Sequence, residues 1–225
     1  MKRRELFLSF LVLGLFVGFT LLVKHHYFEQ LDLDTTVKVQ DHISHSFDTV
    51  FSIFSLIGSA EVISLFLLPP LFLFYKFWRS ILILGGYGFG LFVEVIGKTF
   101  LSHSGPPHLF FRYDLGFNFP SAYIETMHSY PSGHSYRTLF VVYVWVVYLF
   151  ETQSSKSLKA FIFLICAGLC AIMLVSRVCL GEHWTSDVIG GALLGLGLAI
   201  ATCAFRKVSP AIEKLHKHEV RSTNS

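Results

Sequence analysis

Six long apolar runs dominate this sequence and restrict the folds open to it more than any other feature. Each run approaches the length of about 20 residues that an α-helix needs to cross the hydrocarbon core of a bilayer. The predicted spans cover residues 6–23, 60–77, 81–96, 136–150, 160–175 and 188–205. Only 15% of the residues are charged, whereas a soluble domain carries about a quarter. We therefore expect an all-α, six-span transmembrane helical bundle that forms a single membrane domain over residues 1–225.

Basic residues recur at one set of span ends. They are Arg3, Arg4, Lys76, Arg79, Lys156, Lys159, Arg206 and Lys207. Six spans place all of them on the same side of the membrane, which the positive-inside rule assigns to the cytoplasm. We expect a multi-pass cell membrane protein, in the cytoplasmic membrane if the source is bacterial, with both termini cytoplasmic. The polar loops at residues 98–137 and 176–187 then share the extracytoplasmic face.

The segment between the first two spans is polar and acidic at residues 24–46 and changes character after that. Over residues 43–57, apolar side chains recur at helical spacing, and Asp48, Ser52 and Ser55 lie on the opposite face. This pattern predicts an amphipathic helix at the membrane interface. The first apolar run is expected to stay on the chain, because residues 24–27 offer no small-residue cleavage site for a signal peptidase.

Composition argues against two other classes of protein. The formal net charge is only +3, and the basic residues do not form a stripe with exposed aromatic residues, so nucleic-acid binding is not expected. Cys166, Cys170 and Cys203 lie inside apolar runs and Cys179 stands alone in a polar segment. This spacing indicates neither a disulfide framework nor a Cys-x-x-Cys metal site.

Glycines spaced four residues apart occur in three of the predicted spans. The pairs are Gly14 and Gly18, Gly86 and Gly90, and Gly191 and Gly195. Small residues at this spacing let two membrane helices approach closely. We interpret them as packing positions of the bundle.

Three polar clusters fall on the predicted extracytoplasmic face, and their residue types suit phosphoryl transfer. A transferred phosphoryl group carries charge on three oxygens, so its site needs fixed cations and backbone N–H donors. Lys98 in the first cluster and Arg177 in the third supply positive charge. Ser132 and Gly133 in the second supply a hydroxyl group and a backbone that a ligand can approach closely, since glycine has no Cβ.

Two histidines in these clusters could perform the chemistry. His183 is the better nucleophile candidate, because Asp187 follows one helical turn later and could accept its ring N–H. His134 is then the candidate acid for the leaving alkoxide and the candidate base for water. An arginine, a histidine and an aspartate beside a membrane are costly unless they pair or take part in chemistry.

The three clusters together resemble the signature of the type 2 phosphatidic acid phosphatase superfamily. The matching segments are Lys98-x6-Gly105-Pro106, Pro131-Ser132-Gly133-His134 and Ser176-Arg177-x5-His183-x3-Asp187. The resemblance covers about residues 47–205. Members are integral-membrane lipid phosphatases that share a helical core with bacterial acid phosphatases and vanadium haloperoxidases.

The resemblance implies a metal-independent reaction through a phosphohistidine, with no cofactor. His183 would be the nucleophile, Asp187 its partner and His134 the acid. The remaining matched positions, which would bind the phosphate, are Lys98, Ser132, Gly133 and Arg177.

The first motif departs from the family pattern at one position. The family usually has an arginine before the proline, and this chain has Gly105. One guanidinium group is therefore missing from the expected phosphate site. Arg112 and Arg137 are the two candidate substitutes, and Arg137 also resembles the Ser-Gly-His-x-x-Arg variant seen in some lipid diphosphate phosphatases. The sequence does not choose between them.

We expect a phosphatase that hydrolyses a lipid phosphate or diphosphate at the outer leaflet. Candidate substrates are phosphatidate, phosphatidylglycerophosphate and a polyprenyl diphosphate such as undecaprenyl diphosphate. A phosphotransferase to another lipid would use the same residues. The missing arginine also leaves open a non-catalytic binder or transporter of lipid phosphates, although binding alone needs no acid and nucleophile.

Some of the same residues admit simpler interpretations. Lys98 could be an interfacial lysine that pairs with Glu94, one turn earlier. A metal site is a rival interpretation of His103, His108, His128 and Glu125, but they lack a recognised ligand spacing. The order of the three motifs on one membrane face favours the catalytic interpretation.

Overall fold

The computed structural model describes residues 3–73, 77–120, 128–152 and 155–205, and the regular structure in these ranges is helical. The α-helices are α1 (Arg3–Lys24), α2 (Glu29–His42), α3 (Asp48–Ile57), α4 (Ala60–Leu65), α5 (Leu68–Leu73), α6 (Phe77–Phe100), α7 (Gly133–Thr152), α8 (Lys156–Cys179) and α9 (Thr185–Ala204). Two short 3-10 helices are η1 (His45–Phe47) and η2 (His108–Phe110). The prediction of an all-α bundle is confirmed.

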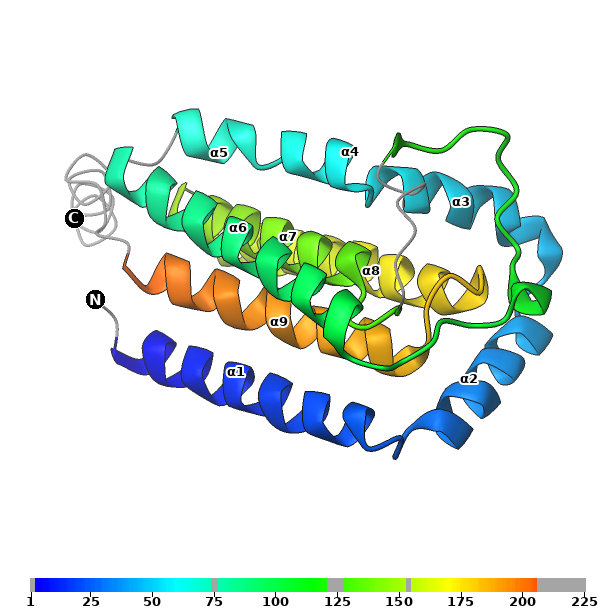
Figure 1. Cartoon of the computed structure of the whole chain (residues 1–225). Helices are drawn as coiled ribbons and strands as arrows, with labels where there is room; N and C mark the ends of the chain where they lie inside the picture. Colours follow the sequence, from blue (N-terminus) through cyan, green and yellow to red (C-terminus); the bar gives the residue numbers. More distant parts are fainter. Residues whose placement is uncertain (1–2, 74–76, 121–127, 153–154, 206–225) are drawn as a thin grey trace, which may run out of the picture.

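Helix α9 lies at the centre of the bundle and packs against α1, α6, α7 and α8 (Figure 1). Within its most apolar stretch, 67% of the residues are buried, compared with 11% for α8 and 22% for α1 and α6. The outer helices therefore turn most of their apolar side chains away from the protein. Such a surface suits lipid and not water.

Glycine determines how closely α7 and α9 approach. A Cβ atom at Gly191 would collide with the carbonyl oxygen of Ser132, and one at Gly195 would collide with that of Tyr136. These obstacles are backbone atoms of α7 and its preceding turn, so they cannot rotate away. The packing role expected for this pair is therefore visible, whereas Gly14 and Gly18 have nothing within 4 Å of their Cβ positions.

Four of the described helices are long and apolar enough to cross a membrane, namely α1, α6, α8 and α9. The segments His45–Ile57 and Ala60–Leu71 meet at a 50° bend, and together they would add a fifth span. Helix α7 is not among these candidates, although it contains the predicted span 136–150. The chain is a membrane protein of several helices, and the count of six crossings stays a prediction.

The region before α6 differs most from expectation. Residues 29–42 form the polar helix α2, which sequence reasoning treated as a connection. The predicted span 60–77 is broken into α4 and α5, and Pro69 and Pro70 fall in the first turn of α5, where a missing N–H costs little. Residues 74–76 of that span lie outside the described residues, and its last residue, Phe77, begins α6.

The predicted amphipathic helix at residues 43–57 corresponds to η1 and α3, and its polar side is the buried one. Asp48, Ser52 and Ser55 are buried, whereas Val50 and Ile53 are exposed. The polar side therefore contacts the protein, and the apolar side is the outer one. The position of this helix at the interface stays a prediction.

The three motifs stand at the ends of four helices, and these ends lie together in the bundle (Figure 1). Helices α6 and α8 finish at the same end of the bundle at which α7 and α9 begin. Helix α2 lies at this end too, whereas the start of α1 and the end of α9 lie at the other. Residues far apart in the sequence therefore meet at one end of the bundle, which we call the motif end.

Candidate active site

His183 and Asp187 lie at the junction between α8 and α9. Nδ1 of His183 faces Oδ2 of Asp187 at 3.4 Å, and that oxygen also accepts the backbone N–H of Trp184 at 3.0 Å. The second bond caps the first turn of α9, where an acidic side chain is favoured. Asp187 is fully buried and His183 nearly so. The carboxylate is thus fixed, and it holds the imidazole by Nδ1 and leaves Nε2 available.

The second motif forms the turn into α7 directly beside this pair. The backbone N–H of Ser132 donates to the carbonyl oxygen of Asp187 at 3.0 Å, which ties the start of α7 to the start of α9. Ser132 is fully buried, and its Oγ lies 3.1 Å from Oγ of Ser135. A Cβ atom at Gly133 would collide with Glu94 and Arg137. Only glycine fits there without moving the charged groups.

His134 follows in the first turn of α7 and is partly buried. Its ring packs against the backbone at Gly58, where a Cβ atom would come within 3.0 Å of its Cδ2 atom. The groups close enough to act on it electrostatically are Arg177, Arg137, His183 and Lys98. The two candidate catalytic histidines therefore share one charged environment.

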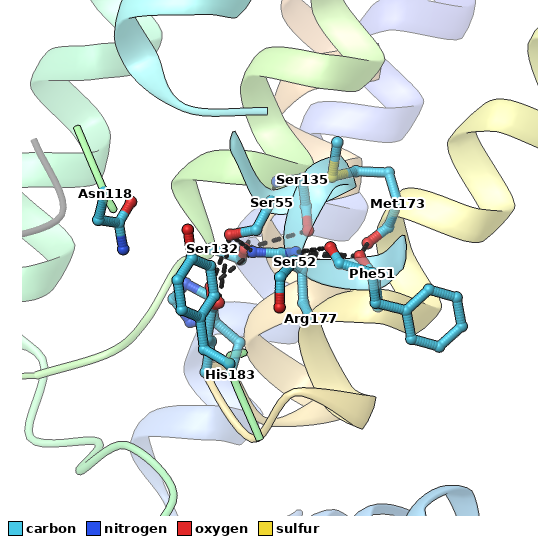
Figure 2. Close-up of polar contacts among 12 residues, drawn as sticks. Phe51, Ser52, Ser55, Asn118, Ser132, Ser135, Met173, Arg177 and His183 are labelled. Atoms are coloured by element: carbon cyan, nitrogen blue, oxygen red, sulfur yellow. Dashed lines mark hydrogen bonds and ion pairs between the residues drawn. The ribbon is translucent and has the colours of Figure 1, made fainter. Parts of the chain in front are cut away.

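Arg177 has no exposed surface. Its Nη1 donates to Oγ of Ser55 at 2.6 Å and forms an ion pair with Oε2 of Glu182 at 2.5 Å. Nη2 donates to Oγ of Ser176 at 3.1 Å. Figure 2 shows Ser55 and Arg177 gathered with Ser132 and His183 between the helices. A buried guanidinium group held this way is a cation fixed in one position.

Lys98 and Arg137 share a single carboxylate. Nζ of Lys98 lies 2.9 Å from Oε1 of Glu94, and Nη1 of Arg137 lies 2.7 Å from Oε2 of the same side chain. The pairing of Lys98 with Glu94 that the sequence suggested is therefore present. It does not remove Lys98 from the site, because its partner Glu94 lies against Gly133 of the second motif and the charge of Lys98 acts on His134. Nε of Arg137 is buried and finds no acceptor among the described residues.

Arg112 is engaged elsewhere. Its Nη2 forms an ion pair with Oδ1 of Asp48 at 2.7 Å, its Nε donates to the other oxygen at 3.2 Å, and its remaining donors bind the backbone carbonyls of Gln40 and Ile43. Its backbone N–H donates to the carbonyl oxygen of Leu180. Arg112 fastens the segment between α2 and α3 to the loops of the motif end.

Gly105 lies beside Ser129, and a Cβ atom there would make ordinary contact at 3.5 Å. The position thus has room for the start of a side chain, and no described backbone atom blocks it.

Sequence reasoning missed several polar residues at this end of the bundle. Ser55 and Glu182 contact Arg177, and Asp32 and His103 lie behind Asp187. Glu182 stands inside the third motif, at a position the motif leaves unspecified. Ser55 and Asp32 come from α3 and α2, so only the tertiary structure brings them here.

The rival metal site has no support from the geometry of the described residues. Over residues 3–73, 77–120, 128–152 and 155–205, no three His, Cys, Asp or Glu side chains are grouped to hold a metal ion. His103 is buried and His108 is exposed. Glu125, the fourth member of the predicted group, lies outside the described residues.

The bundle and its motif end define a class of protein: an integral-membrane protein with a His–Asp pair, a second histidine and three cations gathered in one site. The sequence model of the PAP2 superfamily matches residues 79–210, more than half of the chain, so the chain belongs to this superfamily. The resemblance seen in the three motifs is confirmed.

Two further comparisons agree with this membership. The chain is 30% identical over 141 residues to phosphatidylglycerophosphatase B of Bacillus subtilis (strain 168), an alignment that covers 59% of this chain and 64% of the relative, slightly under two thirds of its length. The fold matches the crystal structure of a transmembrane PAP2 type phosphatidylglycerolphosphate phosphatase from Bacillus subtilis with a TM-score of 0.66. That match covers 88% of this chain and 94% of the other at 19% identity, so it supports the fold alone.

Proposed function

We propose that the chain is a metal-independent lipid phosphatase that works through a phosphohistidine intermediate. The observation that carries the proposal is the arrangement of His183, held by Asp187 through Nδ1, in one charged environment with a second histidine and three cations. An anion binder needs the cations but not a histidine oriented by a carboxylate.

In the first step, Nε2 of His183 attacks phosphorus. The N–P bond forms as the ester P–O bond breaks, and His134 gives its proton to the leaving alkoxide. Asp187 stabilises the positive charge that develops on the His183 ring. In the second step, His134 takes a proton from water, and the resulting hydroxide attacks phosphorus. The N–P bond breaks, phosphate leaves, and both histidines return to their starting states.

Lys98, Arg137 and Arg177 surround the transferred group in this proposal, and Ser132 and Gly133 bring a hydroxyl group and backbone close to it. Arg137 takes the place of the arginine missing at Gly105, because its Nε is buried without an acceptor among the described residues and its charge acts on His134. Every side-chain N–H group of Arg112 is committed to Asp48 or to backbone carbonyls.

We infer that the substrate is a membrane lipid with a terminal phosphate or diphosphate. Phosphatidylglycerophosphate is the first choice, because the name of the Bacillus subtilis relative gives it as the substrate of that enzyme. Phosphatidate and polyprenyl diphosphate share the same phosphate chemistry. Exposed apolar side chains near the motif end, such as Leu109 and Phe111, suit a substrate that arrives from the lipid phase.

The site is proposed to face the extracytoplasmic side. The basic residues Arg3, Arg4, Arg79, Lys156 and Lys159 lie at the starts of α1, α6 and α8, at the end opposite to the motif end. The positive-inside rule places that basic end in the cytoplasm.

The test is phosphate release from detergent-solubilised protein with chelator present. The panel consists of phosphatidylglycerophosphate, phosphatidate and a polyprenyl diphosphate. We expect release from at least one lipid, and we expect His183→Ala to lose more than about 10³-fold in kcat, because the nucleophile is removed. His108→Ala, an exposed histidine of the same end, is the matched control and should behave as wild type.

Three outcomes would contradict the proposal. Wild-type turnover in His183→Ala would reject the nucleophile, and loss of activity with chelator would reject metal independence. No release from any lipid, together with tight binding, would favour the non-catalytic binder. Transfer of phosphate to an added lipid alcohol in place of water would identify a phosphotransferase that uses the same residues.

A further inference from the structure

A second buried histidine and a second buried carboxylate lie directly behind Asp187. Nε2 of His103 lies 3.4 Å from Oδ1 of Asp187 and 3.8 Å from Oδ2 of Asp32. The exposed fractions of His103, Asp187 and Asp32 are 5%, 0% and 1%. Asp32 comes from α2, and His103 comes from the loop after α6. Neither residue belongs to the defining positions of the three motifs.

Ser186 connects the two additional residues. Its backbone N–H donates to Oδ1 of Asp32 at 2.8 Å, and its hydroxyl group donates to Oδ2 at 2.6 Å. Burial raises the pKa of Asp32, and these two hydrogen bonds act in the opposite direction by stabilising the anion. Asp32 is therefore held by a pair of donors from the first turn of α9.

The direction of the hydrogen bonds follows from the single proton of the serine hydroxyl. Because Ser186 gives that proton to Asp32, its Oγ can only accept from Nε2 of His103, which lies 3.2 Å away. Nε2 must then carry the hydrogen of the neutral ring. Nε2 of His103 also lies 3.4 Å from Oδ1 of Asp187, which accepts no hydrogen bond of ordinary geometry from the described residues.

The ring of His103 is fixed by its own loop. Ser129 donates to the carbonyl oxygen of His103 through its backbone N–H at 2.9 Å and through its Oγ at 3.1 Å. The ring also meets Tyr130 edge to face, with the ring centroids 6.3 Å apart. A histidine anchored in this way keeps its Nε2 within 3.8 Å of both carboxylates.

We propose that His103 is a positioning residue of the phosphatase reaction, with its Nε2–H holding the second oxygen of Asp187 and with Asp32, through Ser186, keeping the proton on Nε2. The inference rests on the proposed function. It extends the pair of His183 and Asp187 to a chain of alternating imidazole and carboxylate groups. One oxygen of Asp187 then serves His183, and the other is fixed by His103.

The first test compares two substitutions of His103. His103→Gln can place an amide N–H near the position of Nε2, whereas His103→Leu fills a similar volume without a donor. We expect His103→Leu to lower kcat by about 10- to 100-fold, the loss typical for groups that orient a reacting side chain, with KM little changed. His103→Gln should recover most of kcat. Equal activity of the two variants would overturn the proposal, whether both are active or both are impaired.

The second test reverses the hydrogen bond at Asp32. In Asp32→Asn, the amide oxygen is needed for the backbone N–H of Ser186, so the amide N–H donates to the hydroxyl group. Ser186 then donates to Nε2 of His103, which must give up its proton and no longer holds Asp187. We expect a loss of kcat comparable to that of His103→Leu. Asp34→Asn, an exposed aspartate on the same helix, should match wild type.

The double variant separates positioning from general destabilisation. If Asp32 acts through His103, then Asp32→Asn should change kcat less than about twofold in the His103→Leu background. Independent structural damage would instead multiply the two losses and would contradict the proposal. Thermal unfolding of each purified variant confirms that folded protein is compared.

The two proposals fail in different ways. Activity of His103→Leu at the wild-type level, in a protein that His183→Ala inactivates, rejects only the role of His103. Absence of phosphate release by the wild-type chain rejects the proposed function and this inference with it.

Discussion

Arg137 and Arg112 are both candidates to replace the arginine missing at Gly105, and the two differ in their hydrogen bonds. Arg137 lies against the second motif with Glu94 as its partner, and one of its donors has no acceptor among the described residues. Arg112 is bound on all sides by Asp48 and by carbonyl groups. Arg137 therefore keeps a donor that a ligand could use, whereas Arg112 stabilises the fold.

This distinction predicts opposite effects of the same substitution. Arg137→Lys should lower kcat/KM by about 10- to 100-fold, because a lysine cannot reproduce a guanidinium fork and a hydrogen bond to a charged group contributes about 1.5–3 kcal/mol. Arg112→Lys should lower the unfolding temperature and leave the kcat/KM of the folded protein near that of wild type. Steady-state kinetics and thermal unfolding of both proteins provide the measurement. The assignment is wrong if Arg112→Lys shows the larger kinetic loss.

At the level of single residues, the sequence predicted which motif residues belong to the candidate site, but not the residues outside the motifs. Three motifs converge because each stands at a helix end on the same side of the predicted bundle. Ser55 and Asp32 could not be found this way, since each depends on how α3 or α2 packs against the motif end. Glu182 and His103 stand within motif segments, but only the contacts reveal their partners.

Among the elements, α7 and α9 form the contact on which the site depends most. Ser132 and Asp187 are joined across it by a backbone hydrogen bond, and Gly191 and Gly195 let the two helices approach. Any separation of these helices would move the second motif away from the His183–Asp187 pair. The stability of this contact and the geometry of the site are therefore coupled.

Gly195→Ala tests this coupling with one added methyl group. The new Cβ would meet the backbone of Tyr136 in α7, so we expect a loss of about 1–3 kcal/mol in the free energy of unfolding and a fall in kcat. Gly18→Ala is the matched control, because nothing lies within 4 Å of its Cβ position, and alanine favours a helix over glycine. Thermal unfolding in detergent measures both. Equal unfolding temperatures would show that the α7–α9 contact can adjust.

The spacing of apolar residues predicted helices α2 and α3 only incompletely. Helix α2 has no continuous apolar stripe, and it is held by polar contacts such as Asp32 to Ser186 and Gln40 to the carbonyl oxygens of Phe110 and Cys179. Helix α3 has a clear stripe, but the pattern could not say which face meets the protein. In a membrane protein, the polar face can be the inner one when a charged site lies inside.

Across the whole molecule, the basic residues at the starts of α1, α6 and α8 lie at the end opposite to the motifs. This polarity predicts that the motif end is extracytoplasmic. In a variant without native cysteines, Ser104→Cys at the motif end should react with a membrane-impermeant maleimide in intact cells. Lys156→Cys at the start of α8 should react only after the membrane is permeabilised. The reverse labelling pattern would overturn the proposed orientation.

The carboxylates beside the cations have a consequence for turnover. Glu182 is already paired with Arg177, and Glu94 is already paired with both Lys98 and Arg137, so two carboxylates oppose the charge of the three cations. Under the proposed function, an arriving phosphate must therefore displace these carboxylates from the cations. The same exchange runs backwards when phosphate leaves, because each carboxylate can return to its cation. In that proposed reaction, the protein itself carries the anions that compete with phosphate for the cations.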